Sequence, residues 1–259
     1  GHVMHELGAD VVTIGVQPDG LNINHECGAT HCSTLQKAVK QHHADLGIAL
    51  DGDGDRVMMV DKKGVLYDGD QLVYIIAKHR QQKKALVGGV VGTLMTNLAI
   101  ENTFKKLGIP FLRAKVGDRY VMELLQEKGW QLGGEGAGHI ICMDKHTTGD
   151  GIISALQVLH ALRDTHKTLA EFMRGVVLYP QRLINVTIPK SFNFSKYKAI
   201  KTAQEEAETD LGDKGRILIR ASGTEPLLRV MVEGESKQKV NHWAEQIAKA
   251  VQTACNAEK

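Results

Sequence analysis

Residues 46–60 of the chain are Leu-Gly-Ile-Ala-Leu-Asp-Gly-Asp-Gly-Asp-Arg-Val-Met-Met-Val. The apolar run Leu46–Leu50 ends where three aspartates alternate with glycines, and a second apolar run follows at 57–60. Short apolar runs bounded by turn-forming residues predict buried β-strands. The stretch therefore predicts a strand, an acidic loop and a second strand.

The acidic loop is a candidate metal site. Asp51, Asp53 and Asp55 supply hard oxygen ligands for a small divalent cation, and the glycines allow a tight backbone path. An EF-hand is excluded because that motif needs Gly at its sixth position and Glu at its twelfth, where this loop has Arg56 and Lys62. The alternative is a solvated acidic turn, but like charges so close together repel unless a cation lies among them. Three carboxylates leave positions open on Mg²⁺ for phosphate oxygens.

Outward from this loop, apolar patterns predict alternating strands and helices. Toward the N-terminus they predict a helix ending at Gly8, a strand over 11–16, and a helix to about 43 that opens with a capping box at Ser33 and Gln36. The middle of the chain predicts strands over 85–91 and 111–116 and helices over 71–82, 97–107 and 152–162. The last part predicts strands over 183–188, 216–220 and 227–232 and helices over 196–208 and 237–253.

This order of elements predicts an α/β protein in which successive mixed-sheet α/β domains are followed by a small α+β C-terminal domain. The predicted domains comprise residues 1–67, 68–181 and 182–259. A strand normally precedes the first helix of an α/β unit, so we expect the chain to begin inside its first domain.

A candidate phosphate clamp lies between two apolar strands near the C-terminus. Ser222 and Thr224 offer hydroxyl donors, and Gly223 lets backbone N–H groups approach an anion. Arg220 and Arg229 can form forked, charge-assisted hydrogen bonds to phosphate. The alternative is a hydrophilic hairpin loop, because Ser, Gly and Thr are common turn residues.

Two weaker candidates lie in the middle of the chain. The glycine-rich segment 133–139 carries Glu135, which could bind sugar hydroxyls, and His139, which could bind an anion or assist proton transfer. The segment 115–119 places cations at a strand-to-helix junction. Taken alone, the first is equally a flexible turn and the second is more typical of a surface ion pair.

The composition and the motif content of the chain argue against several classes of function. The chain has 259 residues, with 32 Lys and Arg against 30 Asp and Glu, a formal charge of +2. Interspersed charges disfavour nucleic acid or an anionic membrane as partner. No apolar run approaches the roughly 18 residues of a membrane span, and no signal peptide is visible. No P-loop, GxGxxG or GxSxG sequence is present, so an NTPase, a dinucleotide enzyme or an α/β-hydrolase is not indicated.

The four cysteines form no CxxC pair, which favours reduced thiols in a cytoplasm over a disulfide scaffold. A zinc site built from His25, Cys27, His31 and Cys32 is disfavoured because their spacing matches no usual structural zinc pattern.

In their order along the chain, the acidic loop, the glycine-rich Glu/His loop and the Arg-Ser-Gly-Thr loop resemble the motif loops of the α-D-phosphohexomutase superfamily. The resemblance covers essentially the whole chain. Residues 19–24, 27–30, 115–121 and 147–151 are most similar to the bacterial branch that acts on a hexosamine phosphate.

The resemblance implies an isomerase-class intramolecular phosphotransferase that interconverts glucosamine 6-phosphate and glucosamine 1-phosphate, toward UDP-N-acetylglucosamine and peptidoglycan. A phosphoserine gives its phosphoryl group to the sugar, and the bisphosphorylated sugar returns its other phosphate. It implies Mg²⁺ on Asp51, Asp53 and Asp55, with Arg56 beside the reacting group, and a homodimer is left open. The remaining implied contacts are Lys115 and His139 for proton transfer or as neighbours of a phosphate, Glu135, Gly117, Asp118 and Arg119 for substrate, and Arg220, Ser222, Gly223, Thr224 and Arg229 for the second phosphate.

The chain departs from the superfamily at two points. No Ser-His-Asn sequence of the phosphoserine loop occurs, so we expect a C-terminal fragment that lacks the serine domain and cannot complete a catalytic cycle alone. Gly136-Ala137 stands where relatives usually carry a side-chain amide or similar residue followed by Ser, which removes a potential sugar contact. A phosphomannomutase or phosphoglucomutase relative and a non-catalytic phosphosugar-binding module remain the alternatives.

Overall fold

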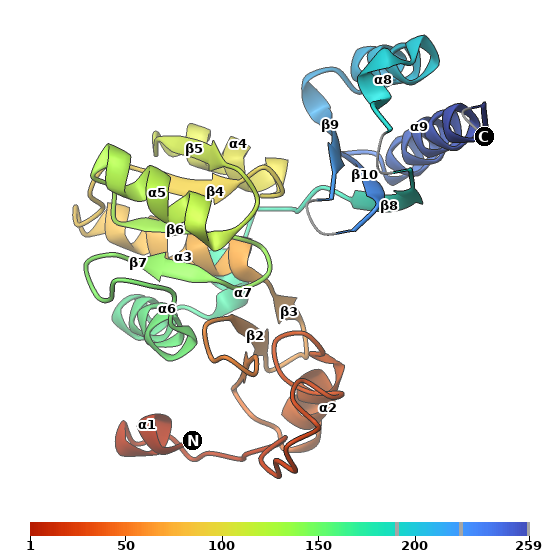
Figure 1. Cartoon of the computed structure of the whole chain (residues 1–259). Coiled ribbons are helices and arrows are strands. Elements are labelled where there is room, and N and C mark those ends of the chain that lie inside the picture. The colour runs from red at the N-terminus through yellow and green to blue at the C-terminus, as the bar shows by residue number, and fades with distance from the viewer. Residues whose placement is uncertain (190–191, 223–224, 258–259) are drawn as a thin grey trace. The chain divides into compact units, whose positions relative to one another are not determined.

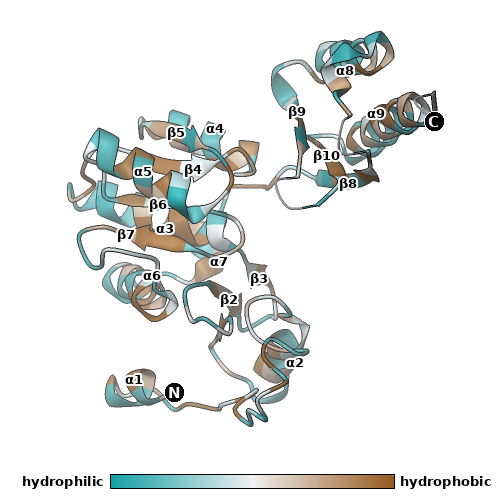
Figure 2. Ribbon diagram, viewed as in Figure 1, coloured by the Kyte–Doolittle hydropathy of each residue, from teal (hydrophilic) through white to brown (hydrophobic). Residues whose placement is uncertain are grey.

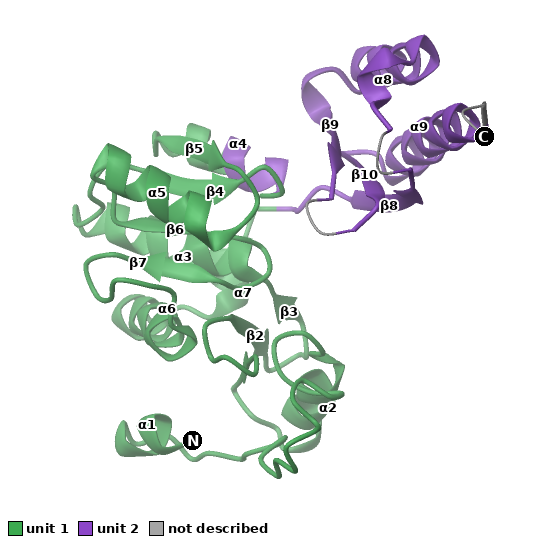
Figure 3. Ribbon diagram, viewed as in Figure 1, with its two compact units in different colours: residues 1–96, 103–176 green, residues 97–102, 177–259 purple. Residues whose placement is uncertain are grey.

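The computed structural model describes residues 1–189, 192–222 and 225–257 (Figure 1). It divides into two compact units: unit 1 comprises residues 1–96 and 103–176, and unit 2 comprises 97–102 and 177–259 (Figure 3). Each unit has its own strands and helices, with two sheets in unit 1 and one in unit 2 among the described residues.

Unit 1 contains two sheets. The smaller is antiparallel, in the order β1-β2-β3. The larger has the order β5-β4-β6-β7, in which β4 pairs in parallel with β5 and β6, while β7 is antiparallel to β6. The strands are β1 Leu46–Leu50, β2 Val57–Asp61, β3 Leu66–Tyr67, β4 Val90–Thr93, β5 Phe111–Ala114, β6 Leu132–Gly134 and β7 Ile140–Cys142.

Two helices join these sheets into one unit. Helix α3 contacts β2 and β6, α6 contacts β1, β2 and β7, and the two helices contact each other. The side chains of Leu72 and Ile75 on α3 are fully buried, so burial of apolar surface holds the sheets together. The helices are α1 His2–Glu6, α2 Ser33–Gln41, α3 Gly69–Gln82, α4 Leu98–Lys106, α5 Asp118–Lys128, α6 Gly151–Thr165 and α7 Leu169–Phe172, with α4 shared between the units.

Unit 2 is a three-stranded antiparallel sheet, in the order β8-β10-β9, with two helices packed on it. Its core includes Val230, Ile247 and Val251, each with no exposed surface. In Figure 2, α8 shows a largely hydrophilic outer face. The elements are β8 Gln181–Thr187, β9 Gly215–Ala221, β10 Leu227–Gly234, α8 Lys198–Leu211, α9 Lys237–Ala257 and the 3₁₀ turns Phe194–Lys196 and Gly212–Lys214.

The α/β fold class is confirmed, and two local predictions are wrong. Residues 11–16 form no strand, because the described chain offers them no strand partner, and the side chain of Val16 is 61% exposed. Ser33 caps no helix: the N-cap is Cys32, and the Gln36 side chain donates to Gly64 O at 2.7 Å instead. In the described part of the chain, no helix combines the length and hydropathy needed to cross a bilayer.

Candidate active site

The acidic loop, residues 51–56, joins two strands that pair Leu50 with Val57. The loop closes on itself, because Gly54 N donates to Asp51 O at 3.1 Å and Arg56 N donates to Asp51 Oδ1 at 3.2 Å. The Arg56 Nε atom lies 3.8 Å from Asp51 Oδ2. Asp51 is thus held by the loop's own backbone and by one guanidinium.

Asp55 lies beside Asp51 and faces the glycine-rich loop. Its Oδ2 is 3.4 Å from His139 Nε2, and its Oδ1 is buried without a hydrogen-bond partner among the described residues. Burial raises the pKa of Asp55, and a hydrogen bond and charge repulsion from Asp51 raise it further. Two carboxylates in contact, one with an unpartnered oxygen, fit a hard cation.

The predicted three-carboxylate arrangement is not formed. Among the residues that the structure describes, no group of three or more His, Cys, Asp or Glu side chains is placed to hold a metal ion. Asp53 is exposed, while Asp51 turns toward Arg56 and Asp55 toward His139. Asp51 and Asp55 remain in contact, and repulsion by their charge is the physical reason why the third carboxylate, Asp53, stays apart from them without a counter-ion.

The glycine-rich segment connects β6 to β7 and docks on the acidic loop. Arg56 and His139 form an antiparallel β-bridge, and Val57 N donates to Gly138 O at 3.0 Å. Gly138 has φ +96° and approaches the Val57 backbone so closely that a side chain would overlap it. These contacts bring together two motifs that are about 80 residues apart in the sequence.

The side chains of Glu135 and His139 lie next to the acidic loop, in an environment that differs from bulk solvent. Burial raises the pKa of Glu135, and the charges of His139 and Arg56 oppose this rise. The His139 side chain is buried, its Nδ1 has no partner among the described residues, and its Nε2 lies 4.0 Å from Asp118 Oδ2. The cluster can hold polar ligand groups and shift a proton between them.

The segment 115–119 is only partly joined to this cluster. Asp118 reaches His139, and Gly117, with φ +125°, is the N-cap of α5. The Lys115 ammonium lies 5.5 Å from the centre of the Tyr120 ring. Arg119 is 81% exposed and pairs with Glu123 at 2.8 Å, so the surface-ion-pair interpretation describes this residue.

The residues predicted to form the phosphate clamp lie in unit 2, where β9 ends and β10 begins. The Arg229 Nη2 atom donates to Ser222 Oγ at 3.4 Å and to Glu225 Oε2 at 3.2 Å, while its Nε is buried without a partner among the described residues. Burial lowers the pKa of Arg220, and the charge of Arg229 lowers it further. Gly223 and Thr224 lie outside the described residues.

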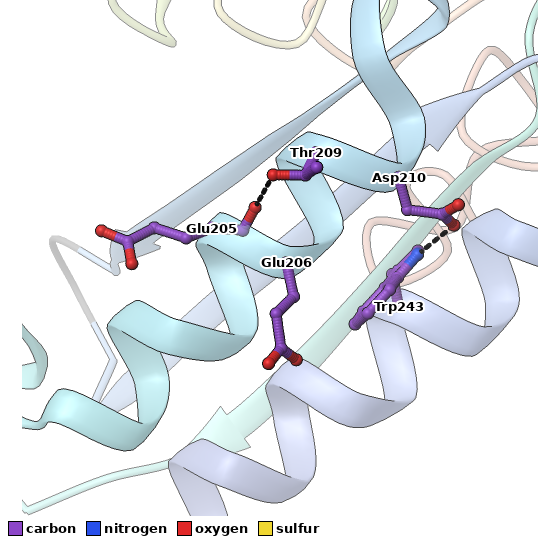
Figure 4. A pocket seen from close by; sticks show the side chains of 5 residues that line it. All are labelled: Glu205, Glu206, Thr209, Asp210 and Trp243. Carbon is purple, nitrogen blue, oxygen red and sulfur yellow. Dashed lines mark hydrogen bonds between the residues drawn. The ribbon is translucent and has the colours of Figure 1, made fainter.

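A shallow hollow between α8 and α9 is a different feature (Figure 4). It is lined by Glu205, Glu206, Thr209, Asp210 and Trp243, and the Trp243 Nε1 atom donates to Asp210 Oδ2 at 2.8 Å. Its three carboxylates repel phosphate. The hollow is therefore not a second phosphate site.

The chain matches three models of one family: "Phosphoglucomutase/phosphomannomutase, alpha/beta/alpha domain II" over residues 1–64, "alpha/beta/alpha domain III" over 68–179 and "C-terminal domain" over 183–250. The chain belongs to the phosphoglucomutase/phosphomannomutase family.

Within the family, the chain is similar to two curated proteins named phosphoglucosamine mutase. The relative from Nitrosospira multiformis is 70% identical over 100% of this chain and 56% of its own length. The relative from Nitrosomonas eutropha is 67% identical over 97% of this chain and 55% of its own length. The chain thus spans little more than half of these relatives.

Solved structures show the same fold at low identity. A phosphoglucomutase/phosphomannomutase family protein from Burkholderia thailandensis has a TM-score of 0.79 at 21% identity, covering 98% of this chain and 57% of that one. N-acetylphosphoglucosamine mutase from Aspergillus fumigatus, in complex with GlcNAc-6P and magnesium, has a TM-score of 0.72 at 23% identity, covering 90% and 54%.

Sequence reasoning missed the contacts of Gly69 and of Gly149–Gly151 with the motif loops. The backbone of Gly69 packs under the glycine-rich loop, with Gly69 N donating to Gly136 O at 3.1 Å. Gly149 and Gly151 were noted only as part of the segment 147–151 that resembles the superfamily. At or just before the start of a helix, the backbone does not need a positive φ, so glycine is not required there for its conformation. A glycine at such a position is therefore the sequence signal that could have indicated a close approach.

Proposed function

We propose that this chain is part of a phosphoglucosamine mutase, which interconverts glucosamine 6-phosphate and glucosamine 1-phosphate. The observation that carries the proposal is the docking of the glycine-rich loop on the acidic loop through Arg56 and His139. It places a guanidinium, an imidazole and several carboxylates in one cluster, as transfer of a phosphoryl group to a sugar requires. The two curated relatives support the choice of glucosamine phosphate.

Asp51, Asp53 and Asp55 would hold Mg²⁺. The unpartnered Asp55 Oδ1 and the adjacent Asp51 carboxylate fit the ion, and the exposed Asp53 would have to turn inward. Bound there, Mg²⁺ would offset charge on the transferring phosphoryl group.

The chain's own side chains supply binding and proton handling. Arg56 stabilises charge on the reacting phosphoryl group, Glu135 accepts hydrogen bonds from sugar hydroxyls, and Lys115 and His139 hold or move a proton at the attacking oxygen. Gly117, Asp118 and Arg119 contact the substrate beside this cluster. The phosphate that does not react binds to Arg220, Ser222 and Arg229, together with Gly223 and Thr224.

The reaction also needs a phosphoryl donor. We propose that a phosphoserine in another domain of the whole protein supplies it, and that these 259 residues alone do not sustain turnover. Within them, domains at 1–67, 68–181 and 182–259 are supported by the ranges of the three family models. The four free cysteines support a cytoplasmic location.

Calorimetric titration tests the proposal. Glucosamine 6-phosphate and mannose 6-phosphate are each added to the chain with Mg²⁺. Tighter binding of the amino sugar is expected; equal or reversed affinities would favour a phosphomannomutase or phosphoglucomutase relative. Binding of either sugar with no turnover, even after the complete natural coding sequence is expressed, would favour a non-catalytic phosphosugar-binding module.

A further inference from the structure

Helix α6 begins at a turn that touches both motif loops of unit 1. Gly149 lies against the imidazole of His139, and a Cβ atom at this position would overlap the ring atoms Cε1 and Nε2. Gly151 donates its N–H to Gly54 O at 2.9 Å, and a Cβ there would lie 2.8 Å from Arg56 O. One short turn thus limits the positions of the histidine and of the acidic loop.

Close approach, and not backbone conformation, explains these glycines. Among the described residues, positive φ angles occur at thirteen glycines, and neither Gly149 nor Gly151 is one of them. An alanine could therefore adopt the same backbone angles. Only its methyl group would conflict, with His139 in one case and with the Leu50 side chain and the acidic loop in the other.

The turn itself is firmly anchored. Asp150 is the N-cap of α6 and accepts the N–H of Ile153 at 2.8 Å, while Ser154 Oγ donates to Ile140 O at 3.2 Å. The second bond joins α6 to β7, the strand that directly follows His139. A side chain added to the turn would therefore displace the imidazole more readily than the turn.

We infer that Gly149 and Gly151 are positioning residues that hold the His139 imidazole against Asp55 and fix the end of the acidic loop. Gly149 acts through His139, keeping Nε2 within 3.4 Å of Asp55 Oδ2. The consequence for phosphoryl transfer rests on the proposed function, whereas the positioning itself does not.

The test measures the accessibility of His139 in the full chain. Diethylpyrocarbonate modifies exposed imidazoles, and peptide mass spectrometry gives the rate at each histidine. In Gly149→Ala we expect modification of His139 to be at least about fivefold faster, the lower end of the effect of overpacking a buried site. Thr148→Ala, which trims the exposed neighbouring side chain, is the matched control, and the buried His79 reports on the fold within each sample.

An unchanged rate at His139 in folded Gly149→Ala would overturn the inference. If Gly149→Ala does not fold, it is repeated in a His139→Ala background. Folding there supports the inference because the obstructing ring is gone, and failure there overturns it. For Gly151→Ala, we expect Asp55 and Arg56 amide signals to shift in NMR spectra, and unchanged signals would remove Gly151 from the assignment.

These outcomes are separable from the proposed function. Failure of the wild-type chain to bind Mg²⁺ or glucosamine 6-phosphate would count against the proposed function and leave the His139 measurement valid. Normal ligand binding with an unchanged His139 rate in Gly149→Ala would count against the inference alone.

Discussion

Arg220 and Arg229 are register partners on β9 and β10 and lie directly opposite each other. Like charges at such positions destabilise a sheet unless an anion lies between them. If this pair binds phosphate as proposed, the repulsion in the ligand-free protein would be relieved by the anion.

Replacing Arg220 with Ala should weaken binding of glucosamine 6-phosphate by about 1.5–3 kcal/mol, the scale of a hydrogen bond to a charged group. Relief of the repulsion should at the same time leave the ligand-free chain as stable as the parent or slightly more so. Calorimetry and urea unfolding measure the two quantities. Arg182→Ala, on the same sheet but paired with Glu245 at 2.9 Å, is the control and should bind normally. Equal affinities in all three proteins would remove Arg220 from the site.

Replacing Asp53 with Asn should weaken Mg²⁺ binding without changing the fold, because the side chain is exposed in the absence of a cation. Removing one charged ligand lowers affinity for a hard ion. A titration with Mg²⁺ measures the effect, with the exposed Asp45→Asn as control. If Asp53→Asn and Asp45→Asn bind Mg²⁺ equally well, Asp53 does not coordinate the ion.

Burial raises the pKa of the Cys142 thiol to about 11, against an ordinary value of 9.0. The folded state thus resists ionisation, and this contribution to stability is fully present below pH 9 and is lost as the pH rises toward 11. The free energy of unfolding should fall by about 2 kcal/mol over that interval through this group. Urea unfolding at several pH values measures it. Cys142→Ala should show a smaller alkaline decrease; the same decrease would assign it to other groups.

Glu233 is fully buried and accepts hydrogen bonds from Arg216 Nε at 2.6 Å and from the backbone N–H of Leu98 at 2.9 Å. Glu233→Ala should destabilise unit 2 by about 3–5 kcal/mol, because it leaves a half-buried guanidinium without its main counter-charge. Hydrogen exchange of unit 2 amides measures the loss. Glu245→Ala removes a surface pair and should cost under about 1 kcal/mol. Comparable losses in both variants would show that burial of Glu233 does not matter.

Strands and helices with long apolar patterns were predicted well from sequence. β1 matches its predicted range, and β9, β10 and the helices of unit 2 match to within a few residues. β6 and β7 were missed because they are three residues long and the first contains two glycines, too short for a period to be visible. The predicted strand over 85–91 is reduced to Val90–Thr93.

The residue types of the candidate site could be predicted from the sequence, but their arrangement in space could not. Alternating aspartates and paired arginines indicate ligands by their chemistry, so Asp55, Arg220 and Arg229 could be predicted as candidates from residue type and spacing. The bridge between Arg56 and His139 could not, because a contact between distant segments depends on how two sheets pack through α3 and α6. The exposure of Asp53, apart from Asp51 and Asp55, likewise depends on local charge repulsion, which a sequence motif does not specify.

The first turns of α4 belong to unit 2, although the chain reaches them long before the rest of that unit. Leu98 and Glu233 are 135 residues apart, and their hydrogen bond closes only when nearly all of the chain has been synthesised. A polypeptide starting at Val177 would therefore lack the backbone amide that Glu233 binds. The buried Glu233 carboxylate would then lose one of its hydrogen-bond donors, so we expect such a polypeptide to be less stable than unit 2 in the full chain.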